Sequence, residues 1–136
     1  MNPHEKPIFT KILLVDDDEA SVYLSSTILQ EMHAAEDIEI ARDGYSASGL
    51  LGKGRWPDII LLDINMPKMD GFEFLEHLKK MGASLKTKII MLTTSARKED
   101  KEKAFSYRNV LDYVEKPLTE EIVRKIAIAY CSMIPL

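Results

Sequence analysis

Acidic, hydroxyl and basic side chains stand at the ends of short apolar runs in this 136-residue chain. Asp16 and Asp17 follow the first run, and Asp63 follows a later one. Two further runs end at Thr93 and Lys116. If these runs are parallel strands, their carboxyl ends lie at one edge of the sheet, which is where open α/β sheets bind ligands. The five side chains are therefore candidates for a single site.

The predicted cluster is suited to a particular chemistry. Carboxylates that converge repel one another, unless a cation lies among them or some of their pKa values rise. Mg²⁺ is the natural cation, because it binds through one or two carboxylates and leaves positions for phosphate oxygens. The predicted set contains acids, a metal, a lysine and a hydroxyl. It is suited to phosphoryl transfer, because catalysis of this reaction consists mainly of positioning the reactants and neutralising their charge.

The apolar runs themselves predict strands. Ile59–Leu62 is wholly aliphatic, as a strand buried on both faces of a parallel sheet requires, and Lys11–Val15 and Lys88–Leu92 are similar. Asp37–Ala41 alternates polar and apolar residues, which is typical of a half-exposed edge strand. Val110–Glu115 is the last predicted strand.

A helix is predicted after each strand, which indicates an α/β fold with a parallel sheet and helices on both of its faces. Asp17 or Asp18 and Ser95 are the expected N-caps of the first and fourth helices, and Asp70 is expected to serve as a turn and capping residue. The fourth helix has a thin apolar face and is expected to be among the less stable parts. The helices are expected at Asp18 to about His33, about Tyr45 to Lys53, Phe72 to Met81, Ala96 to about Ser106, and Ile122 to Tyr130.

Length and composition indicate one soluble domain. We expect residues 1–10 to form a flexible N-terminal arm and residues 11–136 to form the domain. The net charge of -4 and the lack of a basic cluster argue against nucleic-acid binding. The single Cys131 is expected to be a buried, inert thiol. With neither a signal segment nor an apolar run of membrane-spanning length, the expected location is the cytoplasm.

Four motifs, taken in order, resemble the receiver domain of two-component response regulators, over residues 11 to 132. They are Leu14–Asp17, Leu62–Gly71, Leu92–Ser95 and Tyr113–Pro117. The third motif, Leu-Thr-Thr-Ser, is also similar, more weakly, to phytochrome-associated single-domain response regulators. The resemblance implies a three-layer, doubly wound, flavodoxin-like fold whose five parallel strands have the order 2-1-3-4-5.

The resemblance also implies roles for the acids. Asp63 would be the phosphoacceptor, taking a phosphoryl group from a phosphohistidine. Mg²⁺ would be held directly by Asp17, Asp63 and the backbone carbonyl of Asn65, and by Asp16 mostly through a bound water.

Three further residues carry implied roles in catalysis and switching. Lys116 would pair with a phosphoryl oxygen, and Thr93 would hydrogen-bond the phosphoryl group and draw its loop inward. Tyr113 would then turn into the space that is vacated.

The implied partners are a sensor histidine kinase or histidine phosphotransfer protein, and a downstream protein bound by the fourth helix, last strand and last helix. No nucleic acid and no membrane are expected, and a homodimer is left open. A stand-alone receiver of this kind would not be an enzyme for other substrates, since it catalyses only its own phosphorylation and dephosphorylation. A relay that passes the phosphoryl group to another histidine remains an alternative to a switch.

Two places depart from the family pattern. Thr94 stands where many receivers have a small residue, which is expected to narrow access to the site. The turn Phe105–Val110 replaces a Gly-Ala turn, with Asn109 expected in the left-handed conformation, and either packing or a partner surface explains it.

Two other classes of protein share part of this pattern but differ from the chain at one position each. A flavodoxin-like electron carrier needs a phosphate-binding loop after the first strand, where the acids of this chain would repel a phosphate. An aspartate-dependent phosphohydrolase generally has a second acid two residues after its nucleophile, where this chain has Asn65.

Overall fold

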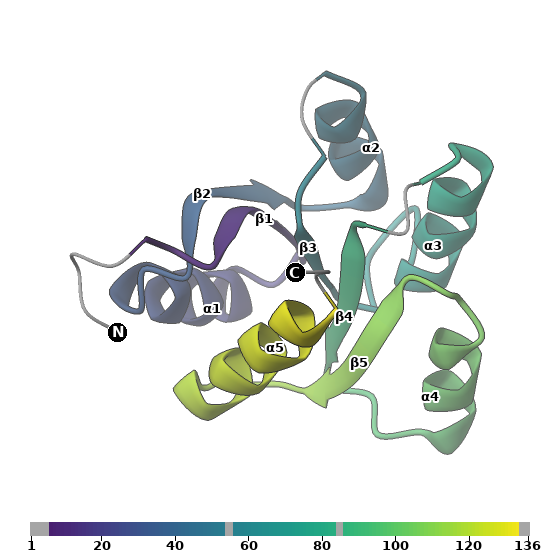
Figure 1. Ribbon diagram of the computed structural model, residues 1–136. Coiled ribbons are helices and arrows are strands. Elements are labelled where there is room, and N and C mark those ends of the chain that lie inside the picture. Colours follow the sequence, from purple (N-terminus) through teal and green to yellow (C-terminus); the bar gives the residue numbers. More distant parts are fainter. Residues whose placement is uncertain (1–5, 54–55, 84–85, 134–136) are drawn as a thin grey trace.

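The computed structural model describes residues 6–53, 56–83 and 86–133. Its five parallel strands form one sheet in the order β2-β1-β3-β4-β5, and a helix follows each strand (Figure 1). This confirms the predicted fold and strand order. The strands are β1 (Phe9–Val15), β2 (Ala35–Ala41), β3 (Ile59–Leu62), β4 (Lys88–Thr93) and β5 (Val110–Glu115). The helices are α1 (Glu19–Glu31), α2 (Gly44–Lys53), α3 (Gly71–Lys80), α4 (Lys98–Phe105) and α5 (Glu120–Ser132).

Alternating side chains of the central strands supply two separate cores. Leu13 and Val15 of β1 pack on the face that α2, α3 and α4 cover, whereas Ile12 and Leu14 pack on the face that α1 and α5 cover. Because both faces are covered, β3 is buried at every position, as its wholly aliphatic sequence predicts. The edge strand β2 is only partly buried, in keeping with its alternating pattern.

The first strand begins earlier than predicted. Phe9 and Thr10 belong to β1, although the sequence predicts that the strand begins at Lys11. Phe9 is 2% exposed, and its ring meets that of Tyr130 edge to face at 5.0 Å, so the burial of one aromatic side chain extends the sheet. Residues 1–5 lie outside the described residues.

Two of the three predicted N-caps are confirmed. Asp18 caps α1, and Asp70 forms a capping box with Glu73 at the start of α3. Ser95 is not the N-cap of α4, which begins at Lys98 after Arg97, without a side-chain cap. The Ser95 hydroxyl instead donates to Asp100 Oδ2 at 2.6 Å. The predicted thin apolar face of α4 is confirmed, since only Ala104 of this helix is buried.

Two smaller predictions are wrong. Asn109 is not left-handed: among the described residues, the only positive φ angles outside glycine are at His33 and Lys68. The Asn109 side chain donates to the carbonyl of Thr87 at 2.9 Å, so a side-chain hydrogen bond shapes the turn. Cys131 is exposed, because α5 turns that position away from the sheet.

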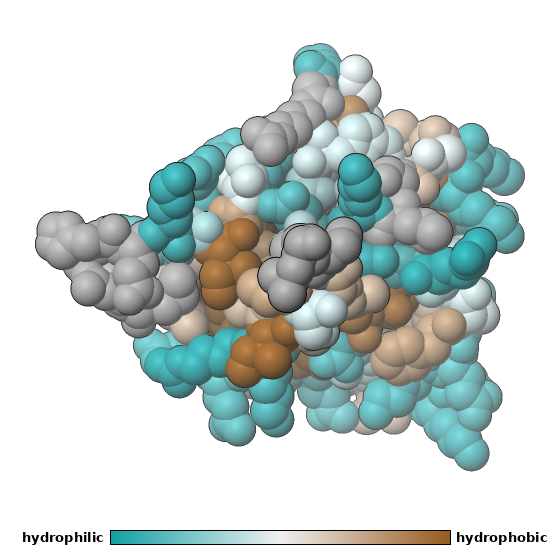
Figure 2. Space-filling view, viewed as in Figure 1, coloured by the Kyte–Doolittle hydropathy of each residue, from teal (hydrophilic) through white to brown (hydrophobic). Residues whose placement is uncertain are grey.

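One face of the molecule carries apolar side chains over α5 and the start of β1, among polar surroundings (Figure 2). Ile8 and Ile128 line one hollow of the surface and are exposed, at 40% and 71%. Among the described residues, no helix combines the length and apolar character that crossing a membrane requires.

Candidate functional site

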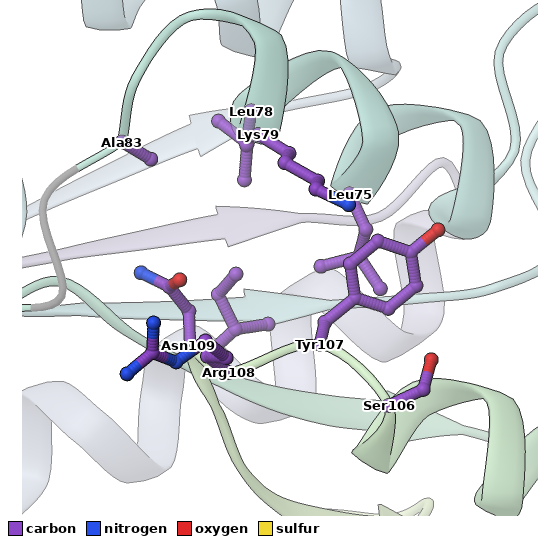
Figure 3. A pocket seen from close by; sticks show the side chains of 9 residues that line it. Leu75, Leu78, Lys79, Ala83, Ser106, Tyr107, Arg108 and Asn109 are labelled. Carbon is purple, nitrogen blue, oxygen red and sulfur yellow. The ribbon is translucent and has the colours of Figure 1, made fainter.

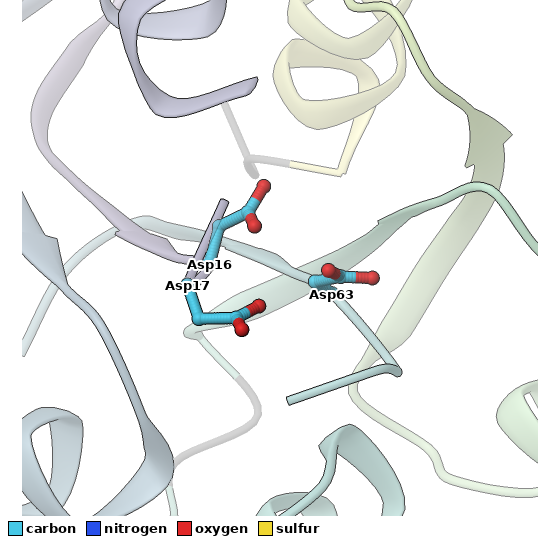
Figure 4. A group of neighbouring side chains, drawn as sticks. All are labelled: Asp16, Asp17 and Asp63. Carbon is cyan, nitrogen blue, oxygen red and sulfur yellow. The ribbon is translucent and has the colours of Figure 1, made fainter. Parts of the chain in front are cut away.

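Three carboxylates converge where β1 and β3 end at the same edge of the sheet (Figure 4). The backbone fixes them, because the amide of Asp16 donates to Ala41 of β2 and the amide of Asp63 donates to Val15 of β1, each at 3.0 Å. Asp16, Asp17 and Asp63 each offer one oxygen, and these oxygens lie within 4.8 Å of one another. The predicted convergence of the acids is therefore confirmed.

Lys116 supplies the cation of the cluster. Its Nζ lies 2.9 Å from Asp16 Oδ2 and 3.1 Å from Asp63 Oδ2. The Lys116 amide donates to the carbonyl of Thr93 at 2.9 Å, which ties the end of β5 to the end of β4. Burial lowers the pKa of the Lys116 ammonium, but its hydrogen bond to Asp16 and the charge of Asp63 outweigh burial, and the pKa is raised above its usual range.

Asp63 is a buried acid beside a cation. Burial raises its pKa above the ordinary value, while the charge and hydrogen bond of Lys116 act in the opposite direction, and the charge of Asp16 raises the pKa further. The amide of Asn65 donates to Asp63 Oδ1 at 3.3 Å. The carboxylate is thus held from both sides, with Lys116 at Oδ2 and a backbone amide at Oδ1.

The two acids after β1 differ in their surroundings. Asp16 is 1% exposed and already accepts hydrogen bonds, whereas Asp17 is exposed to solvent. Hard carboxylate oxygens, one of them open to water, are the ligand set that Mg²⁺ takes in proteins. The residues present therefore fit a magnesium ion.

Thr93 and Tyr113 lie on neighbouring strands beside the acids. Thr93 is fully buried, and its Oγ1 accepts from the amide of Ser95 at 3.3 Å. The Tyr113 hydroxyl donates to the carbonyl of Ser95 at 2.9 Å, and Tyr113 is only 7% exposed. Both predicted switch residues are therefore joined to the same loop after β4.

Gly71 is a structural requirement of the site, whereas the sequence predicts only a break in the chain before α3 at this position. A Cβ at this position would lie 2.5 Å from the backbone oxygen of Asp63 and 2.8 Å from Cα of Ile64. The Gly71 amide also donates to Ile64 at 2.8 Å. The start of α3 can approach the backbone of Asp63 only because residue 71 has no side chain.

The two departures from the family pattern both lie beside hollows. Thr94 is exposed and lines a hollow of about 240 Å³ between α1 and the end of β5, together with Ser21 and Lys116. Ser106–Asn109 and the end of α3 surround a cavity of about 320 Å³ (Figure 3). The Tyr107 hydroxyl donates to Glu76 of α3 at 2.8 Å. Packing against α3 thus accounts for Tyr107, whereas Phe105 in the same turn is 49% exposed.

Comparison with known proteins places residues 12–127 in the family model described as response regulator receiver domain. The chain is 34% identical over 119 residues to the probable methanogenesis regulatory protein FilR2 of Methanothrix harundinacea, which covers 84% of this chain and 76% of that protein. It is 32% identical over 115 residues to the phosphate regulon transcriptional regulatory protein PhoB of Escherichia coli, which covers 84% of this chain but only 49% of that protein.

The chain is also similar to solved structures of response regulators. A two-component response regulator from Cytophaga hutchinsonii superposes with a TM-score of 0.83 at 32% identity, over 94% of this chain and 99% of that one. The chemotaxis protein CheY4 of Vibrio cholerae superposes with a TM-score of 0.74 at 32% identity, over 86% of this chain and 94% of that one.

Proposed function

This chain belongs to the response regulator receiver domain family, and from that premise we propose that it accepts a phosphoryl group on Asp63. The observation that carries the proposal is the geometry at Asp63, a buried carboxylate 3.1 Å from Lys116 Nζ and beside two further acids. A carboxylate held next to a fixed cation is positioned as a nucleophile, because the cation can stabilise the negative charge that develops on the phosphoryl oxygens.

The proposed donor is a phosphohistidine on a sensor histidine kinase or a histidine phosphotransfer protein. An oxygen of Asp63 attacks the phosphorus, and a bond forms between that oxygen and phosphorus. The bond between phosphorus and the imidazole nitrogen breaks, and its electron pair returns to the imidazole. The products are an acyl phosphate on Asp63 and a free histidine on the donor, which takes up a proton from solvent as required.

Asp17 and Asp63 would hold Mg²⁺ directly, together with the carbonyl of Asn65, and Asp16 would act through water. When bound, Mg²⁺ neutralises charge on the acids and on the incoming phosphoryl group. Lys116 is proposed to bind a phosphoryl oxygen from the side of β5, as its bond to Asp63 Oδ2 supports.

Phosphorylation is proposed to act on the loop after β4. The Thr93 hydroxyl would bind the phosphoryl group, and the loop that it shares with Ser95 would follow. The Tyr113 hydroxyl donates a hydrogen bond to the Ser95 carbonyl, so a movement of this loop changes the position that the Tyr113 ring can take. By this route the charge at Asp63 would alter α4, β5 and α5, where a downstream protein is proposed to bind.

Labelling with radioactive acetyl phosphate or a phosphorylated histidine kinase tests the proposal. The wild type should become labelled in a Mg²⁺-dependent manner, and Asp63→Asn should remain unlabelled, because an amide cannot form the acyl phosphate. Asp112→Asn, at an exposed acid on β5, is the matched control and should be labelled like the wild type. Undiminished labelling of Asp63→Asn would exclude Asp63 as the phosphoacceptor.

A further inference from the structure

A serine of α1 reaches into the acidic cluster. The Ser21 hydroxyl donates to Asp16 Oδ2 at 2.7 Å, and the same oxygen receives Lys116 Nζ at 2.9 Å. Ser21 is half-buried, one helical turn after the Asp18 cap, and its position is set by the start of the helix. Nothing in the sequence pattern singles it out, because a serine near a helix start is ordinary.

The other oxygen of Asp16 is also engaged. Asp16 Oδ1 accepts from the amide of Asp18 at 3.0 Å, so the buried carboxylate has a backbone donor on one oxygen and two side-chain donors on the other. The Lys116 ammonium contacts both Asp16 Oδ2, at 2.9 Å, and Asp63 Oδ2, at 3.1 Å. The position of Lys116 therefore depends on how strongly Asp16 attracts it.

We propose that Ser21 is a positioning residue for phosphoryl transfer, whose hydrogen bond to Asp16 keeps Lys116 shared with Asp63. This inference rests on the proposed function. Without the hydroxyl, Lys116 is the remaining side-chain donor to Asp16 Oδ2 among the described contacts. A buried carboxylate that has lost a hydrogen bond attracts its remaining cation more strongly. Lys116 then moves toward Asp16, away from the oxygen that must accept the phosphoryl group.

The same geometry makes the effect of Ser21 on metal binding an indirect one, through Asp16. Asp17 and Asp63 are the acids proposed to hold Mg²⁺ directly, and Ser21 contacts neither of them in any described hydrogen bond. Asp16 is proposed to reach the ion only through water, so loss of the hydroxyl should slow transfer by a much larger factor than it changes the affinity for Mg²⁺. General damage to the site would change both quantities by similar factors.

The test compares Ser21→Thr with Ser21→Val, two side chains of nearly equal shape that differ in the hydroxyl. Initial rates of labelling by acetyl phosphate are measured at saturating Mg²⁺, and the Mg²⁺ dissociation constant is measured by calorimetry. Ser21→Thr should match the wild type, and Ser21→Val should be labelled about tenfold more slowly, with a dissociation constant that changes by a much smaller factor.

Ser21→Ala paired with Ser25→Ala repeats the comparison, in case the β-branched variants do not fold. Ser25 lies one turn further along α1 and is 2% exposed, so its variant loses a buried hydroxyl without touching Asp16 and should be labelled at the wild-type rate. Equal rates for Ser21→Val and Ser21→Thr would overturn the inference, as would a fall in rate accompanied by an equal fall in Mg²⁺ affinity. Absence of labelling in the wild type and in Ser25→Ala would instead overturn the proposed function.

Discussion

At the scale of single residues, Asp63 carries two conflicting requirements. To act as the proposed nucleophile it must be ionised, yet burial raises its pKa above the ordinary value, and Lys116 only partly offsets that effect. A raised pKa in the folded protein means that the folded state binds the proton more tightly than the unfolded chain does. Ionised Asp63 therefore destabilises the fold, and this cost is present in full only above the folded pKa.

Asp63→Asn removes that cost. In buffer with a metal chelator, the variant should have a higher free energy of unfolding than the wild type at pH 7, by on the order of 1 kcal/mol. The difference should shrink as the pH falls through the folded pKa of Asp63 and disappear below the ordinary aspartate value. Urea unfolding at several pH values measures it. A variant less stable than the wild type at pH 7, or a difference independent of pH, would contradict this account.

The acids and the lysine could be predicted from the sequence because each follows an apolar run, and parallel strands bring such positions together. Ser21 could not, since its contact with Asp16 depends on the angle at which α1 leaves β1. The left-handed conformation predicted for Asn109 rests on residue preference alone. The structure differs because the side chain of Asn109 is hydrogen-bonded to Thr87, which lies 22 residues away in the sequence. Phe9 was missed because the burial of its ring depends on Tyr130 of α5.

At the scale of elements, α3 determines where the backbone of Asp63 can lie. The capping box at Asp70 and the close approach of Gly71 fix the first turn of this helix against the end of β3. The start of α3 thus serves as a support for the loop that carries Asp63 and Asn65. Sequence patterns predicted the helix and its cap but not this contact, because a close approach between two backbones leaves no periodic signal.

Gly71→Ala tests that support. The added methyl group would lie 2.5 Å from the Asp63 backbone oxygen, so we expect a loss of about 1–3 kcal/mol in the free energy of unfolding and slower labelling of Asp63. Gly49→Ala in α2 is the matched control, because a Cβ there meets nothing within 4 Å. That variant should gain about 0.5–1 kcal/mol, since alanine favours a helix. Chemical denaturation measures both, and a neutral Gly71→Ala would show that α3 can shift freely.

At the scale of the whole molecule, the site joins strands from both halves of the chain. The acids come from the ends of β1 and β3, and Lys116 from the end of β5, at the far edge of the sheet. A ligand that binds this cluster binds only the folded arrangement, because in the unfolded chain the residues are far apart. Mg²⁺ should therefore stabilise the fold as a whole by mass action.

Thermal unfolding with added Mg²⁺ measures this effect. At a concentration 100-fold above its dissociation constant, Mg²⁺ should stabilise the wild type by about 2.7 kcal/mol. Asp17→Asn should lose most of the increase in melting temperature, because it removes the exposed acid of the cluster. Asp37→Asn, which makes the same change at an exposed position of β2, should keep the increase. An equal increase in both variants would indicate that Mg²⁺ binds elsewhere.

The strand order also has a consequence for the order in which the chain is made. β2, β1 and β3 are neighbours in the sheet and come from the first 62 residues, so this part can pair during synthesis before the rest exists. Asp16 and Asp63 can then meet while Lys116, which follows Asp63 by 53 residues, has not yet been synthesised. The nascent three-stranded sheet carries uncompensated negative charge at its edge, and the arrival of Lys116 after β5 compensates part of that charge. Docking of the last strand thus completes both the sheet and the site.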